Sequence, residues 1–353
     1  MSSDPDATDN PGSWEWAACG ASVTGWQHVA RGLGCDDAYG YGITGDYVVA
    51  TVADGAGSVS GTSAWGSYVA CQSILVDAMD SEFIRDFQSG SAERTQSLMR
   101  WLFDGALGRL VNYAELLDLP IARLSTTLCV AVADRDRAVF GQIGDGVIAA
   151  ERSGSIETVL IEAKDEYANA TWFVQSNGAF EESFRTSVLT EVSAFALSTD
   201  GMSYKITNIA TGEAYEPFFK GSWGHVRSGA PAADFAALLR GIEDDQTGDD
   251  KTMVLAALRW EQDRFHPSAR PVSKTIVNSP PPQPETMSAG PREPQSAEEP
   301  TDEQRNGSVP EQTREQSVVD AIATVDPEVK ADDAPLDPAG ENKRRWFGGR
   351  RHN

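Results

Sequence analysis

The chain has 353 residues, of which 40% are hydrophobic and 23% charged, with a formal net charge of -24. That length and composition allow a sizeable core, in one large domain or two ordinary ones. The acidic balance repels phosphate backbones, so it argues against a nucleic-acid-binding surface and favours a protein that concentrates cations.

The first residues show no targeting segment. Residues 1–13 are polar and acidic, without the basic start and apolar stretch of a secretory signal, and we expect them to be disordered. No stretch approaches the roughly 18 to 20 apolar residues of a membrane span. The four cysteines form no Cys-x-x-Cys pair and are expected to be reduced thiols. We therefore predict a cytoplasmic protein without a membrane span.

The first structured elements are predicted from apolar patterns that stop at glycine-rich turns. Strands are expected over Trp14–Val23 and Asp46–Ala53. Helices are expected over Thr62–Met79 and Arg94–Leu117, where apolar residues recur at helical spacing.

Short strands joined by tight turns follow. They are expected over residues 126–133, 138–143, 147–151, 157–163, 193–198 and 252–259, with a helix from Pro231 to Leu239. Residues 164–192 have no clear pattern. Short connections indicate antiparallel neighbours, and continuous apolar runs indicate strands covered on both faces.

Composition also predicts where the folded part ends. Of the 18 prolines, 13 follow residue 262, so residues 14–261 are expected to form one domain and residues 262–353 a disordered tail. The apolar patch Val318–Val325 and the basic-aromatic end Lys343–Arg351 are candidate contacts for a cognate kinase or regulator. The alternative is an inert solvated spacer.

Six short motifs occur in chain order, most of them where an apolar run stops. They are Asp36-Asp37, Asp54-Gly55, Ser125-Thr126-Thr127, Gly144-Asp145-Gly146, Thr199-Asp200-Gly201 and Asp249-Asp250-Lys251-Thr252. Singly, an Asp-Gly pair is an ordinary turn. Together, the carboxylates at rigid strand ends describe a metal site, and their hard oxygen ligands suit Mg²⁺ or Mn²⁺ better than zinc.

The order of these motifs resembles the metal-dependent protein phosphatases of the PPM (PP2C) family, from about Trp14 to Trp260. A bacterial branch is closer, with a Gly-x-x-His segment, a Cys-Gln-Asp-like motif and Asp-Gly-Ala-Gly-Ser. Here these segments are Gly25-Trp26-Gln27-His28, Cys35-Asp36-Asp37 and Asp54-Gly55-Ala56-Gly57-Ser58. The resemblance implies an α+β fold, an α/β/β/α sandwich of two antiparallel sheets flanked by helices, which also accommodates the predicted elements.

The resemblance also implies a ligand set for two Mg²⁺ or Mn²⁺ ions. Asp54 would bridge the two metals and the Gly55 carbonyl would join it. The two coordination spheres would be completed by Asp37, Asp200 and Asp249, with Asp250 a neighbour that can be replaced.

Further residues match the family's motifs around this centre. Asp145 matches the position where the family often holds an outer or third metal. Asp36 precedes the first ligand, while Asn169 and Thr171 match a segment near the site.

Two positions depart from the family pattern. Many eukaryotic relatives carry a histidine at the position of Ala56, which protonates the leaving group, and an arginine at the position of Gly32, which holds phosphate. His28 is the candidate for the missing acid, and the alternative is a structural histidine. Arg31 is expected to be a surface charge.

The predicted function is that of a hydrolase in signal transduction. It would be a serine/threonine phosphoprotein phosphatase in which a dimetal-bound hydroxide attacks directly, without a covalent phosphoenzyme. The alternative is a catalytically weak module that binds metal or a phosphorylated partner. An integrin-like adhesion motif, Asp-x-Ser-x-Ser, is contradicted by Ala56.

Overall fold

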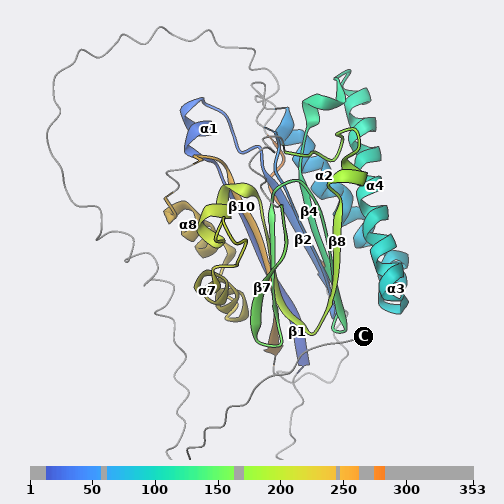
Figure 1. The fold of residues 1–353 in the computed structure, drawn as a ribbon, viewed down its shortest axis with the longest axis vertical. Helices are drawn as coiled ribbons and strands as arrows, with labels where there is room; N and C mark the ends of the chain where they lie inside the picture. Colours follow the sequence, from blue (N-terminus) through green and yellow to red (C-terminus); the bar gives the residue numbers. More distant parts are fainter. Residues whose placement is uncertain (1–12, 57–61, 163–170, 244–246, 262–273, 283–353) are drawn as a thin grey trace, which may run out of the picture.

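The computed structural model describes residues 13–56, 62–162, 171–243, 247–261 and 274–282. Two antiparallel sheets lie face to face, and helices cover the outer face of each (Figure 1). The α/β/β/α sandwich expected from the sequence is thereby confirmed. None of the helices within the described ranges has both the length and the apolar character needed to cross a membrane.

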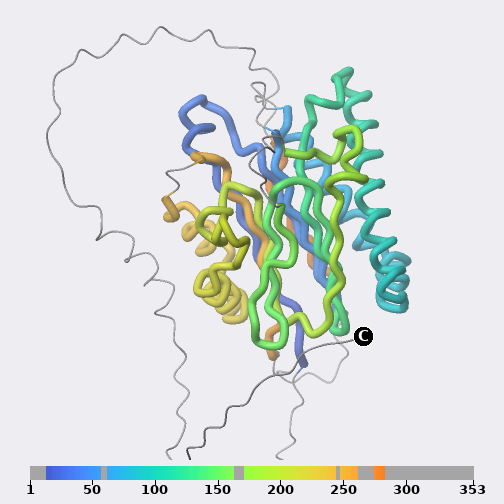
Figure 2. The backbone as a smooth tube through the Cα atoms, viewed as in Figure 1, coloured from blue at the N-terminus to red at the C-terminus, as the bar shows by residue number. Residues whose placement is uncertain are grey.

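One sheet, here called sheet A, contains five strands. In spatial order they are β1 (Ser13–Val23), β10 (Lys251–Glu261), β9 (Val192–Ser198), β6 (Val147–Arg152) and β7 (Ser155–Ile161). β1 pairs with β10 over its whole length, so that Ser13 lies opposite Glu261 and Val23 opposite Lys251. Figure 2 shows β1, in blue, beside β10, in gold and orange.

The other sheet, sheet B, contains six strands. In spatial order they are β11 (Lys274–Asn278), β2 (Ala38–Thr44), β3 (Tyr47–Ala53), β4 (Leu128–Ala133), β5 (Arg137–Ile143) and β8 (Arg185–Thr190). Its central strands β3 and β4 are buried along their whole length, as expected for continuous apolar runs covered on both faces.

Two groups of helices cover the sheets. Sheet B is covered by α2 (Ser63–Ala78), α3 (Ser81–Ser89) and α4 (Ala92–Leu116), and sheet A by α7 (Glu216–Arg227) and α8 (Ala232–Gly241). The shorter helices are α1 (Trp26–Ala30), α5 (Ala179–Glu182), α6 (Ser203–Ile206) and two 3₁₀ turns, η1 (Ile121–Leu124) and η2 (Asp200–Met202).

Successive side chains of a strand pack alternately against the other sheet and against the covering helices. In β10, Val254 and Ala256 pack between the two sheets, while Met253, Leu255 and Ala257 pack against the helices on sheet A. Because successive side chains point to opposite faces, one strand contributes to both apolar layers and holds its ends in a fixed position.

The predicted end of the domain at Glu261 is too early. β11 pairs with β2 over five positions, and the Ser279 N–H donates to the Tyr39 carbonyl at 2.9 Å. The Lys274 ammonium also donates to the Met79 carbonyl at the end of α2, at 2.8 Å. A five-residue edge strand among prolines has too weak a pattern to stand out from the composition around it.

Residues 164–192, expected to be irregular, contain α5 and β8, and β8 forms the edge of sheet B next to β5. The elements β2, α1, α3 and α7 were not predicted either. Disorder was expected for residues 1–13 and 262–353, most of which lie outside the described residues, as do the candidate contacts Val318–Val325 and Lys343–Arg351. Within those two ranges, Ser13 begins β1 and Lys274–Asn278 form β11.

Candidate active site

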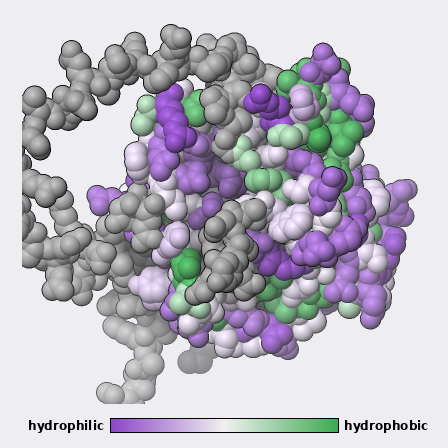
Figure 3. Space-filling model, turned by 45° about the horizontal axis from the view of Figure 1, so that its top comes forward, coloured by the Kyte–Doolittle hydropathy of each residue, from purple (hydrophilic) through white to green (hydrophobic). Residues whose placement is uncertain are grey.

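The acidic motifs meet at one end of the sandwich, where strands of both sheets begin or end. Asp37 precedes β2 and Asp54 follows β3, and the two strands pair so that Ala38 lies opposite Ala53. Asp145 occupies the turn between β5 and β6, Asp200 follows β9, and Asp249 precedes β10. Figure 3 brings this end forward, and much of the middle of the face is coloured as hydrophilic.

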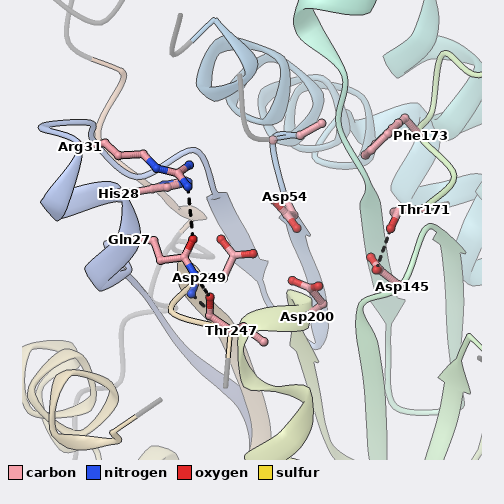
Figure 4. A pocket seen from close by; sticks show the side chains of 12 residues that line it. Gln27, His28, Arg31, Asp54, Asp145, Thr171, Phe173, Asp200, Thr247 and Asp249 are labelled. Atoms are coloured by element: carbon pink, nitrogen blue, oxygen red, sulfur yellow. Dashed lines mark hydrogen bonds between the residues drawn. The ribbon is translucent and has the colours of Figure 1, made fainter. Parts of the chain in front are cut away.

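A cavity of about 340 Å³ opens at this end. Figure 4 shows the side chains of Asp54, Asp200 and Asp249 directed toward the same space, with α1 on one side and Thr171 and Phe173 on the other. The cavity is lined by Gln27, His28, Arg31, Asp54, Gly55, Ala56, Asp145, Thr171, Phe173, Asp200, Thr247 and Asp249.

The backbone of Asp54 is held by the next strand. Its N–H donates to the Thr127 hydroxyl at 3.0 Å, and its carbonyl accepts from the Thr126 hydroxyl at 3.0 Å and from the Thr127 N–H at 2.9 Å. The motif Ser125-Thr126-Thr127, which strand propensity alone would explain, therefore also fixes the position of Asp54.

Gly55 allows a close approach that a side chain would prevent. A Cβ atom at this position would lie 2.6 Å from the Asp36 carbonyl oxygen and 2.7 Å from that of Ser63. The Gly55 N–H donates to the Asp36 carbonyl at 3.1 Å. The glycine thus lets the strand end, the first acidic motif and the start of α2 pack against one another.

Negative charge accumulates around Asp54. Its desolvation, with repulsion from the carboxylates of Asp37, Asp200, Asp249 and Asp145 added, raises the pKa of Asp54 well above its usual range. A carboxyl group in this state becomes more acidic when a cation is placed among the carboxylates.

Asp37 is buried next to this cluster and is not among the residues that line the cavity. Its Oδ2 accepts a hydrogen bond from the Thr199 hydroxyl at 2.7 Å, which ties the start of β2 to the end of β9. Burial first, and then the charge of Asp250, raise the pKa of Asp37 well above its usual range.

Asp36 faces α2 rather than the cavity. Its carboxylate accepts from the Ser63 hydroxyl at 2.9 Å and its carbonyl accepts from the Ser67 hydroxyl. Burial raises the pKa of Asp36 to about 6, although the Ser63 hydrogen bond opposes the shift. Asp36 therefore supports the site by joining it to the first turns of α2.

Asp250 is the centre of a buried hydrogen-bond network. Its Oδ1 accepts from the Gly25 N–H at 2.7 Å, and its Oδ2 accepts from the Asp36 N–H at 2.6 Å and lies 2.9 Å from His28 Nδ1. Asp249 lines the cavity and Asp250 does not, but these contacts give Asp250 a structural role that the sequence did not predict. Both of its oxygens are engaged with donors, at 2% exposure.

His28 lines the cavity from α1, and Asp250 fixes its ring. The hydrogen bond with Asp250 raises the pKa of His28 to about 9, although burial opposes it. Because Asp250 engages Nδ1, Nε2 is the ring nitrogen left to meet a bound molecule, and at neutral pH it carries a proton.

Arg31 is exposed, as expected for a surface charge, and it also lines the cavity. Its guanidinium lies 3.5 Å from the Gln27 side-chain oxygen, and Gln27 in turn donates to the Thr247 carbonyl at 2.7 Å. Figure 4 shows this chain of contacts along one side of the cavity.

On the opposite side, the Thr171 hydroxyl donates to Asp145 Oδ2 at 2.9 Å. The turn that carries Asp145 is supported by Arg185, which donates to the Gly144 carbonyl at 2.9 Å. Asn169, predicted beside Thr171, lies outside the described residues, and so do Gly57 and Ser58.

The residues around the cavity fit hydrated divalent cations. Within the described ranges, no three or more His, Cys, Asp or Glu side chains are drawn together closely enough to enclose an ion by themselves. Mg²⁺ commonly keeps several waters and takes only one or two carboxylates from the protein. Carboxylates spread around a 340 Å³ cavity fit hydrated ions of this kind, and the raised pKa of Asp54 reflects the negative charge that such ions would neutralise.

Several lining residues could not be chosen from the sequence. Gln27 belongs to the Gly-x-x-His segment but is not one of its defining residues, and Phe173 and Thr247 belong to no motif. The one available signal was position, because Gln27 and Arg31 are one helical turn apart and flank His28.

A comparison with protein families matches residues 24–240 to the family described as Protein phosphatase 2C. The match covers more than half of the chain and stops before the motif that contains Asp249. No curated protein matches the chain.

Three of the solved structures that the chain resembles are described here. The catalytic domain of the serine/threonine protein phosphatase PstP, in complex with two manganese ions, is 15% identical, with 70% of this chain and 100% of that chain covered and a TM-score of 0.47. PppA of Pseudomonas aeruginosa is also 15% identical, with 70% and 100% covered and a TM-score of 0.43. The S. agalactiae serine/threonine phosphatase is 13% identical, with 69% and 99% covered and a TM-score of 0.44.

Proposed function

Because the chain belongs to the protein phosphatase 2C family, and is therefore a metal-dependent protein serine/threonine phosphatase, we propose that the cavity around Asp54 is its active site. Phosphorylated serine and threonine side chains would be hydrolysed there in one displacement, without a covalent phosphoenzyme. The observation that carries the proposal is the convergence of Asp54, Asp145, Asp200 and Asp249, from the ends of different strands, on one cavity.

Two Mg²⁺ or Mn²⁺ ions would be held by Asp54, Asp200 and Asp249, with Asp37 and the Gly55 carbonyl completing the set. Asp145 would hold an outer or third ion. When bound, the ions supply Lewis acidity that neutralises phosphoryl charge and makes water a better nucleophile. The clustered carboxylates need such ions, because without cations they would repel a phosphate dianion.

Two cationic side chains on the α1 side of the cavity would complete the chemistry. The Arg31 guanidinium is placed to hold phosphoryl oxygens, in the role that an arginine at Gly32 would have had. His28 would donate the proton on Nε2 to the departing serine or threonine oxygen, in the role of the histidine absent at Ala56. Asp250 keeps the imidazole oriented and protonated.

The test is hydrolysis of 4-nitrophenyl phosphate with and without Mn²⁺. The wild type should turn over only with the metal, and Asp54→Asn should lose at least about 10²-fold in rate, the order expected when a group that stabilises the transition state is lost. The matched control is Asp104→Asn, which removes a carboxylate on α4 that is 53% exposed and paired with Arg100. Full activity of Asp54→Asn, or metal-independent turnover, would contradict the proposal.

The rival assignment was a module that binds metal or phosphoprotein without turnover. It was based on the absence of a histidine at Ala56 and of an arginine at Gly32. His28 and Arg31 line the cavity and could take these two roles, which favours the enzyme over the binding module. A cytoplasmic location, and a kinase or regulator that contacts the tail of residues 262–353, remain predictions.

A further inference from the structure

Helix α1 presents different residues to the cavity and to solvent. Gln27, His28 and Arg31 line the cavity. Trp26 and Val29 are 59% and 62% exposed. Residues three apart lie on the same face of a helix, so these two apolar side chains form a patch at the rim of the cavity, here called the α1 rim.

The α1 rim is held rigidly. The Gln27 N–H donates to the Gly248 carbonyl at 3.0 Å, and the Gly25 N–H donates to Asp250 Oδ1 at 2.7 Å. The Trp26 indole packs against the backbone of Gly248, since a Cβ atom there would lie 2.4 Å from Trp26 Nε1. One side of the ring is therefore braced by the turn that carries Asp249, and the other side remains open.

Single exposed apolar residues are common and need no explanation. The α1 rim differs because it pairs a braced tryptophan with a valine on the element that also supplies the cationic side of the cavity. A rigid aromatic side chain loses little conformational entropy on binding, which is why tryptophan is enriched where binding energy concentrates.

Resting on the proposed function, we infer that the α1 rim docks an apolar side chain of the phosphoprotein substrate. The rim and the cavity-lining residues lie on different sides of one helix, whose diameter with side chains is about 10–12 Å. An extended peptide advances about 3.3 Å per residue, so the docked residue lies within about three positions of the phosphorylated one. The substrate class is a serine or threonine phosphopeptide with a large apolar residue at that spacing.

The experiment uses phosphoserine peptides that each carry one leucine, placed from three positions before to three positions after the phosphoserine, with serine at the other positions. Wild-type enzyme should show a kcat/KM about tenfold higher for one leucine position, the discrimination that one apolar contact can provide. Trp26→Ala and Val29→Ala should each reduce this preference, mainly through KM. The 4-nitrophenyl phosphate rate of both variants should equal that of wild type.

The matched controls are Trp101→Ala and Val76→Ala, which remove side chains that are 51% and 64% exposed on α4 and α2. They should leave the peptide preference unchanged. No leucine preference in wild type, or an equal preference in Trp26→Ala, would overturn the inference while leaving the proposed function intact. If wild type hydrolysed neither peptide nor 4-nitrophenyl phosphate, the proposed function itself would fail, and the inference with it.

Discussion

At the scale of single residues, the adjacent aspartates Asp249 and Asp250 have different roles. Asp249 lines the cavity, whereas Asp250 accepts hydrogen bonds from two backbone N–H groups and engages His28. An asparagine at position 250 would place an NH₂ group against one of these donors. A buried donor without an acceptor costs about 1–3 kcal/mol.

We therefore expect Asp250→Asn to lower the free energy of unfolding by about 1–3 kcal/mol, measured by denaturant titration, and to reduce activity as well. Asp249→Asn is the matched control. It should keep nearly full stability, because no core packing is lost, while its activity falls and needs more Mn²⁺. Unchanged stability of Asp250→Asn would show that the network tolerates an amide.

His28 gives a prediction on leaving groups. An alkoxide is a poor leaving group and gains about 10²–10⁴-fold from a general acid, whereas 4-nitrophenolate gains little. His28→Gln should thus slow a phosphoserine peptide much more than 4-nitrophenyl phosphate. His225→Gln, on α7 and away from the cavity, is the control. Equal slowing of both substrates would assign His28 to phosphate binding or to structure.

The same residue predicts a pH dependence. The acid must be protonated, and Asp250 raises the pKa of His28 to about 9, so the wild-type peptide rate falls as pH rises toward and through that value. Bound cations repel the imidazolium and lower the pKa, so the loss begins earlier in the metal-loaded enzyme. His28→Gln should lack this step. A pH–rate profile with the same alkaline limb in both proteins would contradict the role.

At the scale of elements, β11 is a strand that could not be predicted, because the residues around it are rich in proline and polar side chains. It extends sheet B beyond β2, and its Lys274 joins the end of α2. Because the strand lies at the edge, its backbone pairing contributes more than its side chains do, three of which are exposed.

A chain that ends at Glu261 should therefore be less stable than one that ends at Pro282. The expected difference is about 2–4 kcal/mol, at about 1 kcal/mol for each hydrogen bond lost, measured as the free energy of unfolding. The chain that ends at Pro282 is the matched control and should match the full-length protein. Equal stability of the two shortened chains would show that β11 adds nothing to the sheet.

Elements with long apolar patterns could be predicted from the sequence, as β3, β4, α2 and α4 show. β2 could not be predicted from the sequence, because its glycines are typical of loops. A Cβ atom at Gly40 would lie 2.6 Å from a Leu75 methyl group, and one at Gly42 would lie 2.6 Å from the Met79 sulfur. The glycines let α2 lie directly on the strand, which is a tertiary reason that no local pattern contains.

The site, like the fold, could be predicted only where its residues belong to local motifs. The order of motifs located the carboxylates at strand ends, because each motif is local to its strand. The pairing of His28 with Asp250 joins residues 222 positions apart, and the entry of Arg31 into the cavity depends on how α1 packs. The pairing has no signature in the sequence, and the spacing of Gln27 and Arg31 indicates a shared helix face only once α1 is known.

At the scale of the whole molecule, the net charge of -24 creates a field that every substrate must cross. A phosphopeptide with basic residues is attracted and one with acidic residues is repelled, and salt screens both effects.

We expect kcat/KM for an arginine-flanked phosphopeptide to fall as ionic strength rises from about 20 to 500 mM, over which the screening length shortens several-fold. For a glutamate-flanked peptide of the same length it should rise. The two-peptide comparison cancels effects of salt on the enzyme itself. Parallel salt dependences would show that local contacts, rather than the overall field, control association.

The pairing of β1 with β10 also constrains how the protein is made. A growing chain carries β1 from the start, but its partner strand is translated more than two hundred residues later, and Asp249 arrives with it. Sheets closed by such distant pairings fold slowly, because the loop between the partners must first be ordered. Until β10 has been synthesised, β1 has no partner strand, and its apolar side chains stay exposed and prone to aggregation. Catalytic competence would thus require β10 and Asp249, so that a chain interrupted before them could not remove phosphate.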